Sequence, residues 1–176
     1  MGRPRLPPPA PREAIGPAVA SWYLPLDMRA VVQRVSQASV AVDGEVVGQI
    51  DQGLCALVGV AEQDDERHVE QLVNKVSQLR VFQDALGKMN HSLADIGGAL
   101  LAVSQFTLLG DVRRGHRPSF TAAMEPERAQ QLFEAFCSGV RARGIVVATG
   151  RFRASMQVSL VNDGPVTILI DTEKAF

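Results

Sequence analysis

The sequence predicts a single layered α/β domain, in which mixed, strand-rich β-structure is covered by two main helices. Its 176 residues suffice for one domain with a substantial core but are few for two. Two stretches, LCALVGVA at 54–61 and LLAVSQFTLL at 100–109, are almost continuously apolar, which is typical of strands buried on both faces. Two further segments are apolar along one face only, at helical spacing, which indicates helices lying on a sheet.

The first 27 residues differ in composition from the rest of the chain. They contain seven of the ten prolines and show no periodicity, so we expect a disordered, Pro-rich extension from Met1 to Asp27. A strand pattern, MRAVVQRVSQASVAVDG, begins directly afterwards. The folded domain is therefore predicted to span 28–176, and Met28 is a candidate for the true start of translation. The alternative is a targeting peptide, although the segment is Pro-rich rather than amphipathic.

Two hairpins are expected, one near each end of the domain. In ASVAVDGEVVGQI the pair Asp43–Gly44 stands between two β-type runs, a common signal for a tight turn. Near the C-terminus, MQVSLV and ILID flank the stretch NDGPVT at 162–167, and the two runs are typical of the arms of one buried hairpin. A Gly-Pro pair is unusual in such a turn because proline removes a backbone donor.

Both predicted helices have recognisable ends. The first is expected within DDERHVEQLVNKVSQLRVF, after Asp64 or Asp65 as its N-cap, and His68 falls on its polar side. The second is expected within EPERAQQLFEAFCSGVRARG, with Pro126 in the first turn and Gly144 closing it. The apolar stripes comprise Val69, Leu72, Val73, Val76 and Leu79 in the first helix, and Ala129, Leu132, Phe133, Phe136 and Val140 in the second.

Composition argues against several classes of function. The formal net charge of -1 does not suit a protein that binds nucleic acid or membranes through its overall charge, so a polyanion would need a local basic patch. No apolar stretch approaches the ~20 residues that span a bilayer. Common nucleotide-binding, zinc-protease and serine-hydrolase motifs are absent from the sequence. Cys55 and Cys137, far apart in apolar segments, are expected as buried thiols in a reducing cytosol, and no metal or cofactor is predicted.

Three stretches are candidates for function, each with a purely structural alternative. In SQFT at 104–107, polar residues interrupt a buried-type strand, so they either cap its end or face a site, because unpaired buried polar groups cost about 1 to 3 kcal/mol each. The loop RRGHR at 113–117 is either a solvated turn or a phosphate-binding loop. Gly164–Pro165 either ends the strand ladder or forms a rigid loop with a candidate cis bond and exposed carbonyls.

Taken together, these stretches resemble the D-aminoacyl-tRNA deacylase family. The resemblance rests on the opening MRAVVQRVSQASVAVDGEVVGQI, on SQFTL at 104–108, on the loop RRGHRPSF and on NDGPVT, all in family order. It covers residues 28–176 and departs from the family at the first 27 residues and at His116, where Asn is commoner. It implies a deacylase-like fold with a barrel-like core.

The resemblance also implies an activity and partners. Members are homodimers with active sites near the interface, and they hydrolyse the ester between a D-amino acid and the terminal adenosine of tRNA. A cis Gly164–Pro165 loop from one subunit would enter the site of the other and reject L-amino acids by overlap with their side chains. Glycyl-tRNA, which has no side chain to reject, would also be hydrolysed. Such a protein is expected in the cytoplasm, with tRNA as partner and without membrane association.

The resemblance assigns catalysis to the SQFT stretch. The catalytic residues would be Ser104, Gln105, Phe106 and Thr107, with the backbone N–H groups of Phe106 and Thr107 as oxyanion donors. Thr107 is either a nucleophile or a positioning residue beside Gln105. We favour positioning, with a ribose hydroxyl of the substrate assisting, because no obvious general base accompanies the threonine. No metal is required.

The resemblance also assigns roles to four arginines. By resemblance, Arg34 would buttress the Gly-Pro loop, and Arg113, Arg114 and Arg117 would contact tRNA phosphates.

Two rival functions have less support from the sequence. The related deacylase for a small L-amino acid tends to have Pro and Ala in place of Ser104 and Phe106, and a non-catalytic nucleic-acid-binding module would be expected to carry more positive charge.

Overall fold

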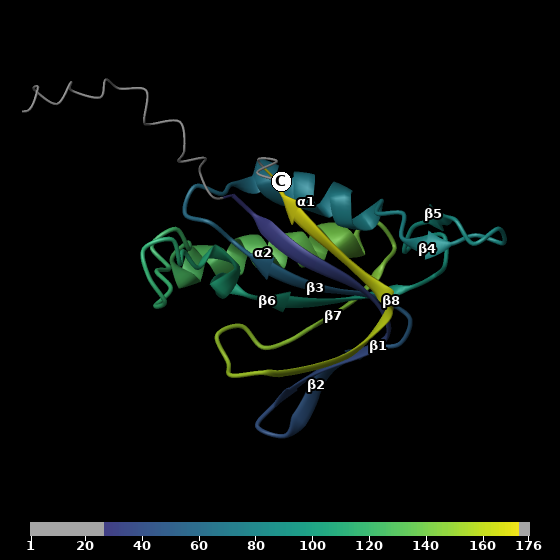
Figure 1. Ribbon diagram of the computed structural model, residues 1–176, viewed down its shortest axis with the longest axis horizontal. Coiled ribbons are helices and arrows are strands. Elements are labelled where there is room, and N and C mark those ends of the chain that lie inside the picture. The colour runs from purple at the N-terminus through teal and green to yellow at the C-terminus, as the bar shows by residue number, and fades with distance from the viewer. Residues whose placement is uncertain (1–26, 173–176) are drawn as a thin grey trace, which may run out of the picture.

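The computed structural model describes residues 27–172, which form a curved sheet with two helices on one side (Figure 1). Residues 1–26, nearly all of the predicted extension, lie outside the described residues, as do residues 173–176. Asp27, the last residue of that predicted extension, is only 2% exposed. Within residues 27–172, none of the helices has the length and apolar character needed to cross a membrane.

The long strand β1 (Arg29–Val42) pairs antiparallel with three others. Along one edge, its first half pairs with β3 (Gly53–Gly59) and its second half with β2 (Glu45–Ile50), while β8 (Gln157–Asp171) follows the other edge. Next to β3, β6 (Ala99–Ser104) and β7 (Val146–Thr149) continue the sheet in parallel pairings. β1 pairs with three strands, and the sheet is so curved that it is nearly a barrel, as predicted.

The turn after β1 and both helices confirm the sequence predictions. Asp43 and Gly44 join β1 to β2 with positive φ at both positions, as a tight hairpin turn requires. The helix α1 (Glu66–Ser77) is capped by Asp65, and α2 (Pro126–Arg141) begins at Pro126. Leu79 was expected on the stripe of the first helix, but α1 ends at Ser77, and Leu79 packs against the core from the following turn. A separate small sheet is formed by β4 (Phe82–Gln83) and β5 (Met89–His91).

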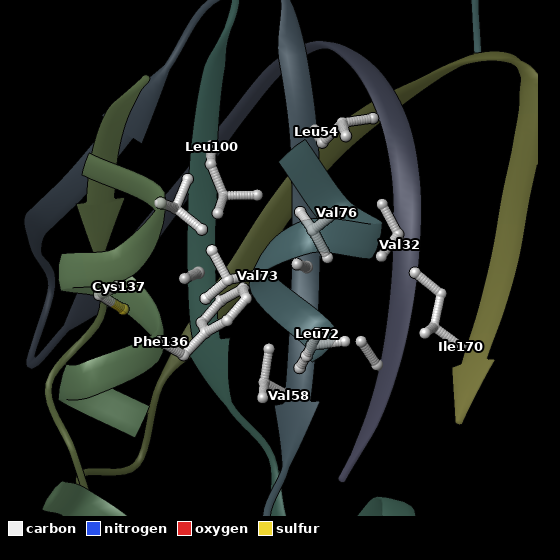
Figure 2. Packing of buried hydrophobic residues seen from close by; sticks show 14 of the residues in the cluster. Val32, Leu54, Val58, Leu72, Val73, Val76, Leu100, Phe136, Cys137 and Ile170 are labelled. Atoms are coloured by element: carbon white, nitrogen blue, oxygen red, sulfur yellow. The ribbon is translucent and has the colours of Figure 1, made fainter. Parts of the chain in front are cut away.

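The core lies between the helices and the sheet, with a second cluster on the opposite face. Figure 2 shows the larger cluster, in which Leu72, Val73 and Val76 of α1 and Phe136 and Cys137 of α2 cover strand residues such as Leu54, Val58 and Leu100. Cys55 and Leu101, their neighbours in β3 and β6, belong to the other cluster. Both strands are therefore buried on both faces, as their apolar runs predicted. Both cysteines are free and buried, and burial raises the pKa of each thiol to about 11.

The predicted C-terminal hairpin is wrong. Residues 157–171 form the single strand β8, which pairs with β1 along almost its whole length, and the NDGPVT stretch lies within that strand. Instead of reversing the chain, the stretch forms a bulge, because β1 offers a continuous partner on both sides of it.

Candidate active site

The bulge in β8 lies opposite Arg34 of β1. Gln33 pairs with Thr167 and Val35 pairs with Asn162, so residues 163–166 face the single residue Arg34. The Gly164–Pro165 peptide bond is cis, and both residues are exposed, although they belong to a strand of the main sheet. The extra length of chain therefore projects from the ladder as a short loop with its backbone accessible.

Arg34 supports this loop from beneath. The residue is 6% exposed, and its Nε donates a 2.8 Å hydrogen bond to the Asp163 backbone oxygen. One terminal nitrogen of the guanidinium donates to the Val81 oxygen, and Nε lies 3.4 Å from a carboxylate oxygen of Asp163. An arginine suits this position because its guanidinium is planar and always charged and can donate to carbonyl oxygens in two directions at once. Arg34 therefore connects the loop to the segment before β4.

The side chain of Asn162 braces the loop from within the strand. Its Oδ1 accepts a 2.7 Å hydrogen bond from the Val166 backbone nitrogen, and its Nδ2 donates to the Val166 oxygen and to Thr167 Oγ1, each at 3.2 Å. Gly164 has φ +146, and a Cβ built there would lie 2.7 Å from Val166 Cγ2 and 3.0 Å from an Arg34 nitrogen. Only glycine fits this conformation and this space without a shift.

The SQFT stretch makes a sharp change of structure. β6 ends at Ser104, and the chain continues as the short 3₁₀ helix η2 (Phe106–Leu109). The Gln105 backbone nitrogen still donates to Val58 at 2.7 Å, and its side-chain amide donates to Thr107 Oγ1. The N–H groups of Phe106 and Thr107, at the start of η2, have no acceptor within that helix. The polar residues thus lie where the strand ends, and they leave backbone donors there.

A cavity of about 490 Å³ opens beside this strand end. Ser104, Gln105 and Phe106 line it from one side, and Phe152, Arg153 and Met156 line it from the segment between β7 and β8. Thr107 is not among the lining residues but is hydrogen-bonded to Gln105. Neither Arg34 nor Gly164–Pro165 lines the cavity, so a single chain does not bring the two predicted parts of the site into one pocket.

The basic loop is attached to the SQFT turn, and one of its arginines is already paired. Phe120 packs edge-on against Phe106, with ring centroids 5.0 Å apart, and Asp111 pairs with Ser119 across the base of the loop. Arg113 binds the Asp111 carboxylate through Nε and a terminal nitrogen at 2.9 and 2.7 Å, which holds the pKa of Asp111 well below its usual range. Arg114 and Arg117 are exposed and donate no hydrogen bond within the described part of the chain.

Comparison with known proteins places this arrangement in a family. A family model described as D-Tyr-tRNA(Tyr) deacylase matches residues 31–171. The chain belongs to this deacylase family. Proteins named D-aminoacyl-tRNA deacylase from Symbiobacterium thermophilum and Sorangium cellulosum are 60% and 58% identical over 149 and 150 residues, which cover 85% of this chain and 99% and 100% of theirs.

Two solved structures share the fold of this chain. The structure of the c-Myc DNA Unwinding Element Binding Protein is 42% identical, with a TM-score of 0.76, over 81% of this chain and 97% of that one. A probable eukaryotic D-amino acid tRNA deacylase is 18% identical, with a TM-score of 0.72, over 82% of this chain and 98% of that one, a likeness that concerns the fold alone.

Sequence reasoning missed two residues at this deacylase-like site. Asn162 lies in the NDGPVT stretch and has no predicted role, although its carboxamide holds the loop closed. Arg153 lies at the cavity with a left-handed φ of 62 and makes no hydrogen bond or ion pair within residues 27–172. The sequence held a signal for Asn162, because asparagine often bonds to nearby backbone, but none for Arg153, whose position depends on a loop conformation.

Proposed function

We propose that this chain is a D-aminoacyl-tRNA deacylase, a hydrolase that cleaves the ester of D-aminoacyl-tRNA and of glycyl-tRNA in the cytoplasm. The observation that carries the proposal is the exposed Gly164–Pro165 backbone, braced by Arg34 and Asn162 within an otherwise regular strand. A braced stretch of backbone has no side chain that could rotate away from an incoming group. It is therefore suited to reject an L-amino acid by overlap, whereas a D-amino acid directs its side chain elsewhere and glycine has none.

We further propose that the working enzyme is a homodimer in which this loop enters the cavity of the partner copy. The loop and the cavity share no residue in one chain, which supports completion of each site by a second copy. Large apolar side chains are exposed in η2 and along β8: Phe106 is 56% exposed, and Val161 and Leu169 of β8 are 48% and 56% exposed. Exposed apolar side chains on the strand that carries the loop are suited to contact with a partner.

The residues at the cavity favour catalysis by positioning. Among the described residues that line the cavity, Arg153 has the only titratable side chain, and none offers a carboxylate or an imidazole as a general base. The N–H groups of Phe106 and Thr107 are suited to stabilise the oxyanion, and each such donor typically contributes about 2.7 to 4 kcal/mol to lowering the barrier. Gln105 and Ser104 would orient the ester and the attacking water, while a ribose hydroxyl of the substrate assists.

Charge around the cavity suggests where the tRNA lies. Arg117 and Arg153 have no partner among residues 27–172 and are available for phosphates, as is exposed Arg114. Arg113 was predicted to do the same, but its guanidinium is engaged by Asp111. We therefore propose that Arg114, Arg117 and Arg153 contact phosphates and that Arg113 chiefly shapes the loop.

The decisive experiment offers the purified protein D-tyrosyl-tRNA, L-tyrosyl-tRNA and glycyl-tRNA in separate reactions without added metal. We expect release of D-tyrosine and glycine and no release of L-tyrosine above the spontaneous rate. Equal hydrolysis of the D- and L-esters would reject the selective role of the loop, and hydrolysis of neither would reject the deacylase function.

Replacing Thr107 by alanine tests the positioning role. If the hydroxyl only positions, the Thr107→Ala variant should keep D-tyrosyl-tRNA hydrolysis within about tenfold of the unaltered protein, since loss of a true nucleophile costs orders of magnitude more. Single-turnover hydrolysis measures this, and circular dichroism verifies the fold. A loss beyond about a thousandfold in a folded variant would establish the hydroxyl as the nucleophile.

Removal of Arg117 and removal of Arg113 should have different effects on tRNA affinity. Arg117→Ala should weaken tRNA binding and lower the slope of log affinity against log salt by about 0.7, the value for one phosphate contact on a single strand. Arg113→Ala should change the slope less, because that charge is already paired with Asp111. Binding measured across a salt series compares the two, and equal slopes would contradict the assignment.

A further inference from the structure

The first residue of η2 is held differently from its last residue. Leu109, the last, is fully buried, whereas Phe106, the first, is 56% exposed. The strand ladder reaches only to Gln105, whose backbone nitrogen donates to the Val58 oxygen at 2.7 Å. Phe106 is therefore the first residue beyond the sheet, although its N–H group is one of the two proposed oxyanion donors. Its position depends on contacts from outside the sheet.

Phe120 supplies such a contact. The rings of Phe106 and Phe120 meet edge-on, with their centroids 5.0 Å apart and an angle of 66° between their planes. This arrangement is favourable because the positive edge of one ring faces the negative face of the other. Phe106 lines the proposed active-site cavity, so the ring pair fixes one wall of that cavity.

The segment that carries Phe120 is attached to the end of β3. The Ala123 nitrogen donates to the Phe120 oxygen at 3.0 Å, and Ala123 forms a β-bridge with Ala61. The next nitrogen along the chain, that of Met124, donates to the Val60 oxygen at 3.0 Å. Both partners directly follow β3 in the sequence. The ring of Phe120 therefore stands on backbone that the main sheet holds in place.

The basic loop joins the end of η2 to this ring. It leaves η2 at Gly110, and two hydrogen bonds between the backbones of Asp111 and Ser119, at 2.8 and 2.9 Å, close its base. The space beneath the ring is small, since a Cβ built on Gly110 would lie 3.0 Å from Phe120 Cε1. Arg117, a proposed phosphate contact, stands three residues before the ring.

We propose that Phe120 is a positioning residue for the hydrolysis, which fixes Phe106 and with it the first oxyanion donor. The inference rests on the proposed deacylase function. Phe120 is not among the residues that line the cavity, so its effect passes through Phe106. One loop then has two separable tasks. Arg117 binds the substrate, whereas Phe120 holds a group that stabilises the transition state, and losses of the two should differ kinetically.

The test compares the single-turnover rate of D-tyrosyl-tRNA hydrolysis with the Kd for uncharged tRNA in variants of the full chain. Phe120→Leu removes the ring but keeps an apolar side chain. Its rate at saturating enzyme should fall about tenfold, because a small displacement of a donor is costly, while its Kd stays within about twofold. Phe120→Tyr keeps the ring and should retain the rate. Val112→Ala, which shortens a 60% exposed side chain of the same loop, is the matched control and should change neither quantity.

Three outcomes would overturn the role of Phe120. One is a lower melting temperature of Phe120→Leu with an unaltered rate in the folded protein, which would make the ring pair a stabilising contact only. Another is an equal loss of rate in Phe120→Tyr, and the third is a parallel loss of rate and tRNA affinity. Phe120→Met gives the same comparison should Phe120→Leu not fold. Absence of hydrolysis by the unaltered chain would instead reject the proposed function, so the two failures are distinguishable.

Discussion

Replacing Gly164 by alanine should lower kcat/KM for D-tyrosyl-tRNA about a hundredfold while leaving the protein folded. The new methyl group would lie 2.7 Å from Val166 Cγ2, 2.9 Å from the Val166 nitrogen and 3.0 Å from an Arg34 nitrogen, in a residue with φ +146. Contacts this short cannot persist, so the loop must move, and a displacement of about 1 Å at a reacting site can cost a factor of a hundred. Initial rates of ester hydrolysis and a melting curve measure both effects.

Gly44→Ala is the matched control for this change. Gly44 also has a positive φ, +83, but lies in the β1–β2 turn with nothing within 4 Å of the added carbon. It should therefore show the cost of backbone strain alone, about 1 to 3 kcal/mol of unfolding free energy, with unchanged turnover. If Gly164→Ala hydrolyses D-tyrosyl-tRNA as fast as Gly44→Ala does, the loop has no part in the reaction.

The features that the sequence predicted well are those set by local chemistry. The apolar stripe and the cap Asp65 locate α1, and Asp43–Gly44 locates the first turn, because each depends on residues within one or two turns of chain. The fold class and the SQFT strand end followed from apolar runs and their interruption. The phosphate contact predicted for Arg113 could have been revised from the sequence. Asp111, the acidic residue that pairs with it, lies only two residues away.

The features that the sequence did not predict depend on pairing between distant segments. Nothing near NDGPVT indicates that β1 continues past it, so a local interpretation favoured a hairpin, whereas the register with β1 makes it a bulge. The structural alternative for the Gly-Pro pair, an end to the ladder, fails for the same reason, because β8 continues to Asp171. His68 was predicted on the polar side of its helix, yet its side chain is only 12% exposed. Its burial beside Asp27 and Asp64 likewise depends on how β1 and α1 pack, which no local pattern encodes.

The support beneath the loop should be as important as the loop itself. We expect Arg34→Lys to reduce hydrolysis of D-tyrosyl-tRNA at least about tenfold and to lower the free energy of unfolding by about 3 kcal/mol. Arg34 binds the backbone oxygens of Asp163 and Val81 in two directions, and a lysine ammonium cannot reproduce that fork. One of the two carbonyls would then lose its charged donor, and the loop would lose its fixed distance from the sheet.

Asp163→Asn separates the role of the arginine fork from that of the ion pair. The Asp163 side chain is 53% exposed and lies 3.4 Å from Arg34 Nε, so its charge should contribute little stability. Because Arg34 also binds the backbone oxygen of Asp163, this variant should keep the loop in place and retain nearly full turnover. If Asp163→Asn is as impaired as Arg34→Lys, the ion pair, and not the backbone contacts, positions the Gly164–Pro165 loop.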